Sequence, residues 1–275
     1  MGRNFVVDVD RCTACQLCVI ACKDEHVGQS HQPWAQPQPD TGHFWIRIDT
    51  LERGHTPRVQ VTHLPIHCQH CANAPCLRAC PRGAIKRRDD GLVWIDAAQC
   101  DGCGLCQQAC PYDVIYLNPE LNIAQKCTGC AHRIDRGHLP RCVDICPHEA
   151  ITYGDVSGVA SASFDVLRPE HGAEPTVYWR NLPKPWIAGT LIDRGRDEVI
   201  ADATVIAVDL VESRSISIRT DAFGDFRIAG LSSGRKYRLE IYKDGYQPFR
   251  TVATTDGDQD LGEIALNPES TRPQS

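Results

Sequence analysis

The sequence predicts an α+β protein with two domains, a cysteine-rich domain of short strands and helices followed by a seven-stranded β-sandwich. The chain has 275 residues, a length that suggests about two domains. All 16 cysteines lie between Cys12 and Cys146. From Trp186 onward, seven short apolar alternations are separated by turn residues, which is the spacing typical of a sandwich.

In the cysteine-rich part, short strand-like segments lie between the runs of cysteines. Each of them alternates apolar and polar residues and leads into or out of a cysteine loop. The first cysteine run passes into a helix in CQLCVIACKDEH, and the proline-containing residues 27–43 are predicted to form an irregular insertion. The predicted strands are NFVVDVD, HFWIRIDT, GLVWID and DVIYLN.

The second half of the chain is predicted to contain a connector and then the sandwich. Residues 156–185 show little periodicity and hold several prolines, as an extended connector does. We therefore place the cysteine-rich domain at 1–155, the sandwich at 186–268 and a disordered tail at 269–275. The seven predicted strands are WIAGTLID, ATVIAVDL, SISIR, GDFRIAGL, KYRLEIYK, FRTVAT and DLGEIAL.

Charge and hydropathy argue against several classes of protein. The net charge is −6 and no long basic run occurs, which argues against nucleic acid as a partner. No stretch approaches the roughly 20 apolar residues of a membrane-spanning helix. The N-terminus, MGRNFVVDVDRC, lacks the apolar core of a signal peptide. We therefore expect a cytoplasmic protein, or one exported together with a partner that carries the signal.

The cysteines fall into four groups of four along the chain. A secreted, disulfide-stapled protein would be short and would carry cysteines throughout, so metal or cluster binding is the better interpretation here. The third group, CDGCGLCQQACP, is C-x2-C-x2-C-x3-C-P without deviation. This is the bacterial ferredoxin run, in which three thiolates bind one 4Fe–4S cube and the fourth ligates the neighbouring cube.

The other three groups depart from this run at few points. The first has Lys23 in place of the proline, and the second and fourth widen the gap before the third cysteine to four and eleven residues. A loop insertion there leaves the geometry at the cube intact, so we predict a tandem bacterial-ferredoxin-like domain with four 4Fe–4S clusters. Zinc is the competing interpretation, but zinc sites usually take two C-x2-C knuckles, which a three-plus-one pattern fits poorly.

Two groups of a ferredoxin-like pair exchange their fourth cysteines. Nesting would couple the second group with the third and the first with the fourth, while pairing of adjacent groups remains open from the sequence. The nested ligand sets are Cys12, Cys15, Cys18 and Cys146; Cys22, Cys127, Cys130 and Cys142; Cys68, Cys71, Cys76 and Cys110; and Cys80, Cys100, Cys103 and Cys106.

Charged residues beside the ligands are candidates for tuning the clusters. Each oxidised cube with its four thiolates carries roughly −2, and nearby positive charge raises its reduction potential. Lys126 and Arg141 adjoin ligands in the sequence, and we assign the tuning role to these two. Around the second group lie His63, His67 and His70, for which we predict surface or surrounding roles because four cysteines already fill the site.

The fourth group has the form K-C-T-x-C-x-x-R…G…P-x-C-x-x-x-C-P. Together with the other groups it resembles the iron–sulfur subunits of the dimethyl sulfoxide reductase family of molybdenum enzymes, over about residues 1–155. Many members have an aromatic residue where this chain has Gly129. The resemblance implies an electron-transfer subunit whose active site lies in a large molybdopterin catalytic subunit. That partner would carry the molybdopterin guanine dinucleotide with molybdenum.

The resemblance also bears on assembly and chemistry. The segments GHFWIRID, HCANAPC, CPYDVIYLN, IAQKCTGCAH and PTVYWRNL are similar to those of the small subunits of pyrogallol–phloroglucinol transhydroxylases and resorcinol hydroxylases. The sandwich, with TDAFGDFRIAGL, resembles transthyretin-like, carboxypeptidase-regulatory-like domains. This implies a heterodimer, or a multiple of one, that hydroxylates polyhydroxylated aromatics such as resorcinol or pyrogallol and exchanges electrons with an external acceptor or donor. The alternative is a respiratory molybdenum reductase for sulfur or arsenic oxyanions.

Overall fold

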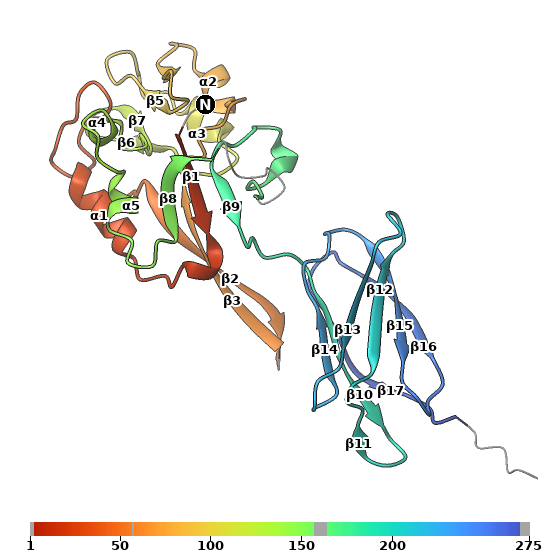
Figure 1. Cartoon of the computed structure of the whole chain (residues 1–275). Coiled ribbons are helices and arrows are strands. Elements are labelled where there is room, and N and C mark those ends of the chain that lie inside the picture. The colour runs from red at the N-terminus through yellow and green to blue at the C-terminus, as the bar shows by residue number, and fades with distance from the viewer. Residues whose placement is uncertain (1–2, 57, 157–163, 270–275) are drawn as a thin grey trace, which may run out of the picture. The chain divides into compact units, whose positions relative to one another are not determined.

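The chain divides into two compact units, whose elements are drawn in Figure 1. Each unit has a hydrophobic core of its own. The first unit contains the residues up to Leu51 and Thr62–Leu182, and the second contains Glu52–Val61 and the residues from Pro183 onward. The computed structural model describes residues 3–56, 58–156 and 164–269.

A three-stranded sheet in the order β8-β1-β9 lies in the first unit. β1 pairs antiparallel with β8 and parallel with β9. Its apolar residues Phe5 and Val7 are buried, as are Ile151 of β8 and Trp179 of β9, so the alternation in NFVVDVD produces a central strand with a buried face. The strands are β1 (Arg3–Asp8), β8 (Ile151–Asp155) and β9 (Tyr178–Arg180).

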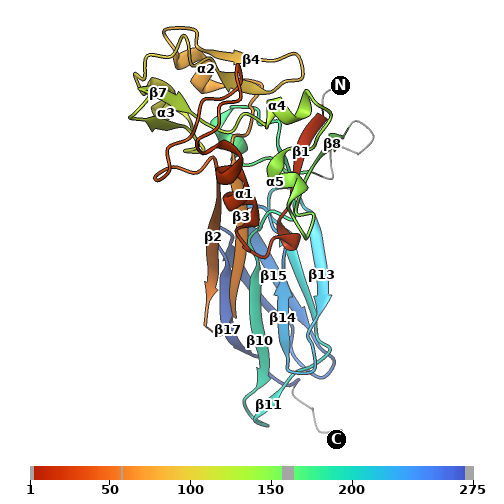
Figure 2. The ribbon, with the colours of Figure 1, turned by 90° about the vertical axis from the view of Figure 1, so that its left-hand side faces the viewer.

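Short helices and hairpins carry the cysteine runs of the first unit. α1 and α5 lie side by side, as Figure 1 and Figure 2 both show, and α2 packs against α3. Within the described part of the chain, every helix is too short or too polar to span a bilayer. The remaining elements are η1 (Val9–Arg11), α1 (Leu17–His26), β2 (Ile46–His55), β3 (Arg58–His67), α2 (Pro75–Ala79), β4 (Ile85–Arg87), β5 (Val93–Ile95), α3 (Leu105–Ala109), β6 (Tyr116–Asn118), β7 (Ile123–Gln125), α4 (Ala131–Ile134), α5 (Arg141–Asp144) and η3 (Pro169–His171).

The second unit is a sandwich of two four-stranded sheets. One has the order β13-β12-β15-β16, and the other has the order β11-β10-β14 with β17 also paired to β10. Val205 and Ala207 of β12 and Leu239 and Ile241 of β15 are completely buried, which is the alternation of a sheet with one face in the core. The strands are β10 (Ile187–Asp193), β11 (Glu198–Val199), β12 (Thr204–Asp209), β13 (Ser215–Arg219), β14 (Asp225–Ile228), β15 (Lys236–Tyr242), β16 (Phe249–Thr254) and β17 (Gln259–Ala265).

The predicted fold class is confirmed, and all seven predicted sandwich strands are present. β11, which has only two residues, is an addition that the sequence pattern was too short to signal. The predicted strands of the first unit and the helix in its first cysteine run are also present. Residues 27–43, all of them described, contain only isolated bridges, in agreement with the predicted irregular insertion.

The connector begins later than predicted. β9 lies inside the segment that we predicted as an extended connector, because Trp179 is completely buried and its strand completes the sheet beside β1. Residues 164–182 therefore belong to the first unit. Residues 157–163 of that segment, and the predicted tail from residue 270 on, lie outside the described residues.

A second difference from the predicted boundaries concerns the tip of the β2–β3 hairpin. Glu52–Val61 precedes the second cysteine group in sequence but belongs to the second unit. There the Arg58 guanidinium donates to both carboxylate oxygens of the nearly buried Asp260, at 3.1 and 3.0 Å, and to Asp225 at 2.6 Å. Because Asp260 and Arg58 are little exposed, water and salt screen this ion pair less than they screen a surface pair.

Candidate metal centres

The structure brings the cysteine thiols together in four neighbourhoods, each drawn from two distant stretches of the sequence. Thiol charges act on one another's pKa mainly within four sets, and the thiols of two of these sets each line one cavity. We call the sets quartet A (Cys12, Cys15, Cys18 and Cys146), quartet B (Cys22, Cys127, Cys130 and Cys142), quartet C (Cys68, Cys71, Cys76 and Cys110) and quartet D (Cys80, Cys100, Cys103 and Cys106).

Quartets A and B share the helices α1 and α5. Cys18 and Cys22 stand one turn apart on α1, while Cys142 lies in α5 and Cys146 just beyond it. Burial, followed by the charges of the other thiols of quartet A, raises the pKa of Cys18 to about 12. Burial and the neighbouring thiols of quartet B raise the pKa of Cys22 well above its usual value. Thiols in such a setting stay protonated unless a metal centre supplies positive charge.

Quartets C and D share α2 and α3 in the same way. Cys76 lies in α2 and Cys80 at its end, and Cys106 and Cys110 have the same relation to α3. Burial and then the neighbouring thiols raise the pKa of Cys76 to about 12 and that of Cys106 to about 11. All four thiols of quartet C line one cavity together with Tyr112 and other side chains.

The four quartets follow one another in the order A, B, C, D. α1 and α5 join A to B, and α2 and α3 join C to D. The inner quartets B and C adjoin, since the backbone N–H of His70 donates to Cys68 Sγ and its ring Nε2 lies 4.0 Å from Cys127 Sγ. Cys15 of quartet A and Cys103 of quartet D are exposed, whereas every thiol of quartet B is buried. The row therefore has accessible ends and a shielded middle.

Backbone amides point at the sulfurs in all four quartets. Four thiols per site, with amide donors directed at them, match the ligand set of a 4Fe–4S cube, whose potential depends on such hydrogen bonds. The amide-to-Sγ contacts are His70 to Cys68 at 3.5 Å, Ala124 to Cys100, Gly129 to Cys127 and Ala150 to Cys146 at 3.3 Å, and Arg141 to Cys130 at 3.4 Å.

Gly129 has a physical reason to be glycine in this chain. Its φ is +67°, a left-handed conformation that disfavours side chains. A Cβ at this position would lie 2.8 Å from both Cδ atoms of Leu92. Leu92 thus occupies the space that a side chain here would need, so a larger residue at this position would require Leu92 to move.

Lys126 lies in the interior between quartets B and C. It is 2% exposed, and its Nζ donates to the carbonyl of Cys127 at 3.0 Å and to that of Val93. Burial opposes the charge, but the thiols of Cys68, Cys76 and Cys127 raise the pKa of Lys126 above its usual value. It is a buried cation whose charge is stabilised when the cysteines of both quartets are ionised.

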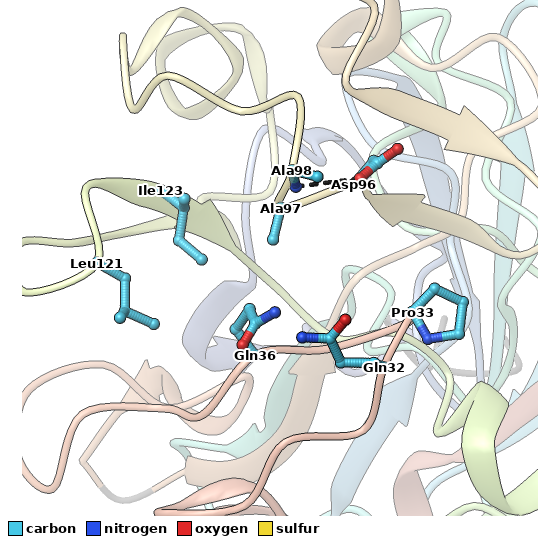
Figure 3. A pocket seen from close by; sticks show the side chains of 8 residues that line it. All are labelled: Gln32, Pro33, Gln36, Asp96, Ala97, Ala98, Leu121 and Ile123. Carbon is cyan, nitrogen blue, oxygen red and sulfur yellow. Dashed lines mark hydrogen bonds between the residues drawn. The ribbon is translucent and has the colours of Figure 1, made fainter.

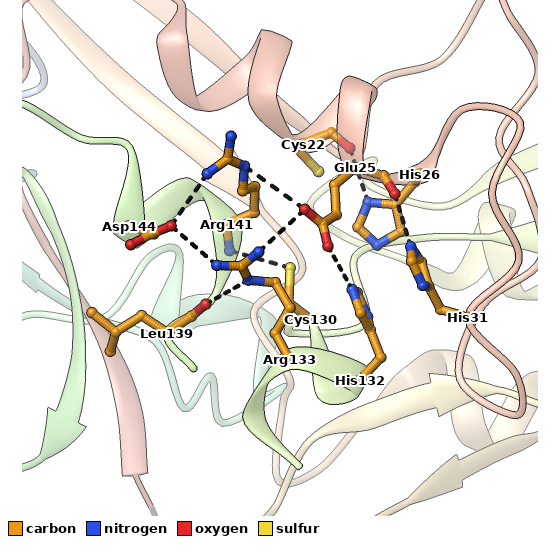
Figure 4. Close-up of polar contacts among 10 residues, drawn as sticks. All are labelled: Cys22, Glu25, His26, His31, Cys130, His132, Arg133, Leu139, Arg141 and Asp144. Carbon is orange, nitrogen blue, oxygen red and sulfur yellow. Dashed lines mark hydrogen bonds and ion pairs between the residues drawn. The ribbon is translucent and has the colours of Figure 1, made fainter. Parts of the chain in front are cut away.

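Arg141 contacts Cys130 through its backbone N–H, while its guanidinium contacts carboxylates (Figure 4). The side chain lies 3.7 Å from Glu25 and 3.2 Å from Asp144, two carboxylates that balance its charge. Arg133 contacts the same two carboxylates, and His132 donates to Glu25 at 2.9 Å. Burial would raise the pKa of Glu25, but the bond from His132 and the charge of Arg133 lower it.

A surface hollow of about 390 Å³ lies beside the loop that precedes Cys100 (Figure 3). The side chains around it are mainly apolar or amide, such as Gln32, Gln36 and Leu121. Asp96 is the one ionisable side chain among the described residues that line it, and it pairs with Lys86 at 2.7 Å. The hollow offers no nucleophile with a base beside it.

Comparison with known proteins agrees with this arrangement. The 4Fe-4S dicluster domain family matches residues 59–156, and the carboxypeptidase regulatory-like domain family matches residues 187–267. The chain is 34% identical to the pyrogallol hydroxytransferase small subunit of Pelobacter acidigallici, over 95% of this chain and 98% of that protein. It is 33% identical to a component of the anaerobic dimethyl sulfoxide reductase of Escherichia coli, over 62% of this chain and 77% of that protein. This protein belongs to the iron–sulfur subunits of molybdopterin oxidoreductases.

A further relative of this iron–sulfur subunit is a component of the tetrathionate reductase of Salmonella typhimurium, with 34% identity over 66% of this chain and 74% of that one. The predicted resemblance is therefore confirmed, and so is the role of an iron–sulfur electron-transfer subunit. The sequence predicted a surface or surrounding role for His70, and the structure places it in the interior, in contact with a cysteine of each inner quartet. Its position inside the C-x2-C turn of the second group was the available signal.

Proposed function

We propose that this iron–sulfur subunit conducts electrons through four 4Fe–4S cubes to or from a large molybdopterin subunit that hydroxylates a polyhydroxylated aromatic such as resorcinol or pyrogallol. The observation that supports an aromatic substrate is how much of the chain is similar to each relative. The match to the pyrogallol hydroxytransferase small subunit runs through 95% of the chain and includes the sandwich, whereas the match to the tetrathionate reductase component covers 66%.

We assign one cube to each quartet, since each brings four thiols together in a largely buried site. A bound 4Fe–4S cube takes up and releases one electron at a time. The helices α1, α2, α3 and α5 hold the thiols in place, and the amide donors stabilise the negative charge that an added electron brings. The thiol neighbourhoods support the nested sharing of ligands over the pairing of adjacent groups.

The order of the quartets suggests how electrons pass through the subunit. Quartets A and D carry the exposed thiols Cys15 and Cys103, while B and C lie between them in the interior. Exposed apolar side chains adjoin both ends, with Leu17 and Ile20 beside quartet A and Leu105 beside quartet D. We propose that electrons enter at one end and leave at the other, and that the molybdopterin subunit docks at one of these ends.

Ligand sharing is tested by the iron content of paired cysteine variants. Removal of Cys71 and Cys110 together takes two ligands from quartet C alone, so the nested scheme predicts the loss of one cube, to about 12 iron atoms per chain. The matched control, removal of Cys71 and Cys80, takes one ligand from each of two quartets and should disturb two cubes. If the first pair also disturbed two cubes, as pairing of adjacent groups requires, the nested scheme would be wrong.

The substrate class is tested on the purified complex. The subunit should co-purify with a molybdenum-containing partner, and the complex should turn over resorcinol or pyrogallol. Similarity to the tetrathionate reductase component favours a second candidate, a reductase of sulfur oxyanions. Turnover of tetrathionate without turnover of any phenol would replace the first proposal with the second. About four zinc ions and no iron would remove both.

A further inference from the structure

His70 contacts a cysteine sulfur of each inner quartet. Its backbone N–H donates to Cys68 Sγ of quartet C at 3.5 Å. Its ring Nε2 lies 4.0 Å from Cys127 Sγ of quartet B, at the long end of the range for an N–H···S contact. The residue is 1% exposed, so no water competes for either contact. One residue thus spans the gap between the two ligand sets.

The other ring nitrogen determines where the proton of the imidazole lies. The backbone N–H of Val93 points at His70 Nδ1 at 3.0 Å, so Nδ1 is the acceptor of that bond. A neutral imidazole has one donor and one acceptor nitrogen. The proton therefore sits on Nε2, which makes Nε2 a donor toward Cys127 Sγ.

The surrounding structure holds the ring in this orientation. Phe5 stacks on the ring with centroids 6.2 Å apart and planes within 10°. The hydroxyl of Thr176 donates to the carbonyl of His70 at 3.0 Å. The backbone of His70 has a φ of +43°, in the left-handed region, and lies in the loop whose N–H donates to Cys68. The placement of both donors is thus built into the fold.

We propose that His70 is a hydrogen-bonded bridge between the two inner clusters, and that its ring Nε2–H stabilises the reduced form of the cube held by quartet B. This inference rests on the proposed function, since it needs cubes in quartets B and C. An N–H donor to a ligand sulfur stabilises the extra negative charge of the reduced cube and so raises its potential. The backbone donor acts on quartet C in the same sense, but no side-chain substitution removes it.

The test compares two substitutions that differ in reach. His70→Asn keeps an acceptor near the Nδ1 position for the Val93 N–H and tolerates a positive φ, but its side chain is too short to approach Cys127. His70→Gln carries an amide donor near the Nε2 position and should restore most of the lost bond. His67→Asn is the matched control, because His67 is equally buried beside Cys68 but its ring bonds to a backbone carbonyl at 2.8 Å.

The measurement is a potentiometric titration of the loaded complex followed by EPR, with each cube's signal identified through a cysteine variant of its quartet. His70→Asn should shift the redox equilibrium of the quartet B cube toward the oxidised form by about tenfold, which is 59 mV for one electron. The quartet C cube should shift much less, His70→Gln should lie near the wild type, and His67→Asn should shift neither cube.

The possible outcomes distinguish failure of the His70 bridge from failure of the proposed electron-transfer function. Iron content well below four cubes in the wild type would defeat the proposed function itself. Four cubes with an unchanged quartet B potential in His70→Asn would overturn the bridge while leaving the electron-transfer function standing. Equal shifts in His70→Asn and His67→Asn would also overturn it, because they would show a general effect of packing.

Discussion

Replacement of Lys126 by methionine tests whether a buried cation sets the potentials of the two inner cubes, which we propose for quartets B and C. Methionine has about the length of the lysine stem and removes only the charge and the donor. The nearest thiols belong to quartets B and C, so both inner cubes should become harder to reduce. The outer quartets, A and D, should respond much less.

The expected size follows from Coulomb's law. At a separation of about 4 Å and an effective dielectric constant of about 20, a unit charge contributes about 4 kcal/mol, and proportionally less at a greater distance. Because 1.36 kcal/mol corresponds to about 59 mV for one electron, the potentials of the inner cubes should fall by on the order of 100 mV. Water that enters the space would reduce this value but would not reverse its sign.

The assay is a potentiometric titration with iron content measured on the same sample. Lys86→Met is the matched control, because it removes one charge that is 38% exposed and already paired with Asp96 at 2.7 Å. A surface pair of this kind contributes at most about 1 kcal/mol. If Lys126→Met and Lys86→Met shifted the inner cubes equally, or Lys126→Met shifted neither, the tuning role of Lys126 would be refuted.

Three further predictions concern stability. Gly129→Ala should lower the free energy of unfolding by about 2 kcal/mol or more, because of left-handed strain and contact with Leu92. In thermal unfolding, the double variant with Leu92→Ala should lose less stability than the two single variants together. Strict additivity of the two losses would contradict the steric contact. Arg58→Met should destabilise the second unit by about 3 kcal/mol in calorimetry, because the nearly buried Asp260 loses a charged partner. An unchanged transition would refute this. Burial lowers the pKa of His26 to about 4. Because His26 therefore binds a proton more tightly in the unfolded protein than in the folded one, the free energy of unfolding should fall by about 2 kcal/mol as the pH drops from 7.5 to 5. His26→Gln should make the free energy of unfolding less dependent on pH over this range. Parallel pH profiles of the two proteins would count against this.

Much of the molecule could be predicted from the sequence because its signals are local. A ferredoxin run such as CDGCGLCQQACP specifies its own loop and helix, since three ligands two residues apart must wrap one cube. The sandwich strands were recognisable for a similar reason, because alternation with period two is a property of each strand alone. β9 escaped prediction, since three residues carry little periodicity and Trp179 is buried only by its pairing with β1.

Properties that depend on distant stretches of the sequence needed the tertiary structure. The sequence by itself determined the sixteen candidate ligands, the class of centre and the sandwich. It left open which thiols share a site, because Cys22 and Cys127 meet only through the packing of α1 against α5 and of the loops around them. Likewise, Lys126 was a candidate from its position next to a ligand, but only the fold decided that it lies buried between two quartets. His70 shows the same limit, since its contact with Cys127 joins residues that are far apart in the sequence. Local spacing specifies a ligand loop, whereas the neighbours of that loop are set by the packing of the whole unit.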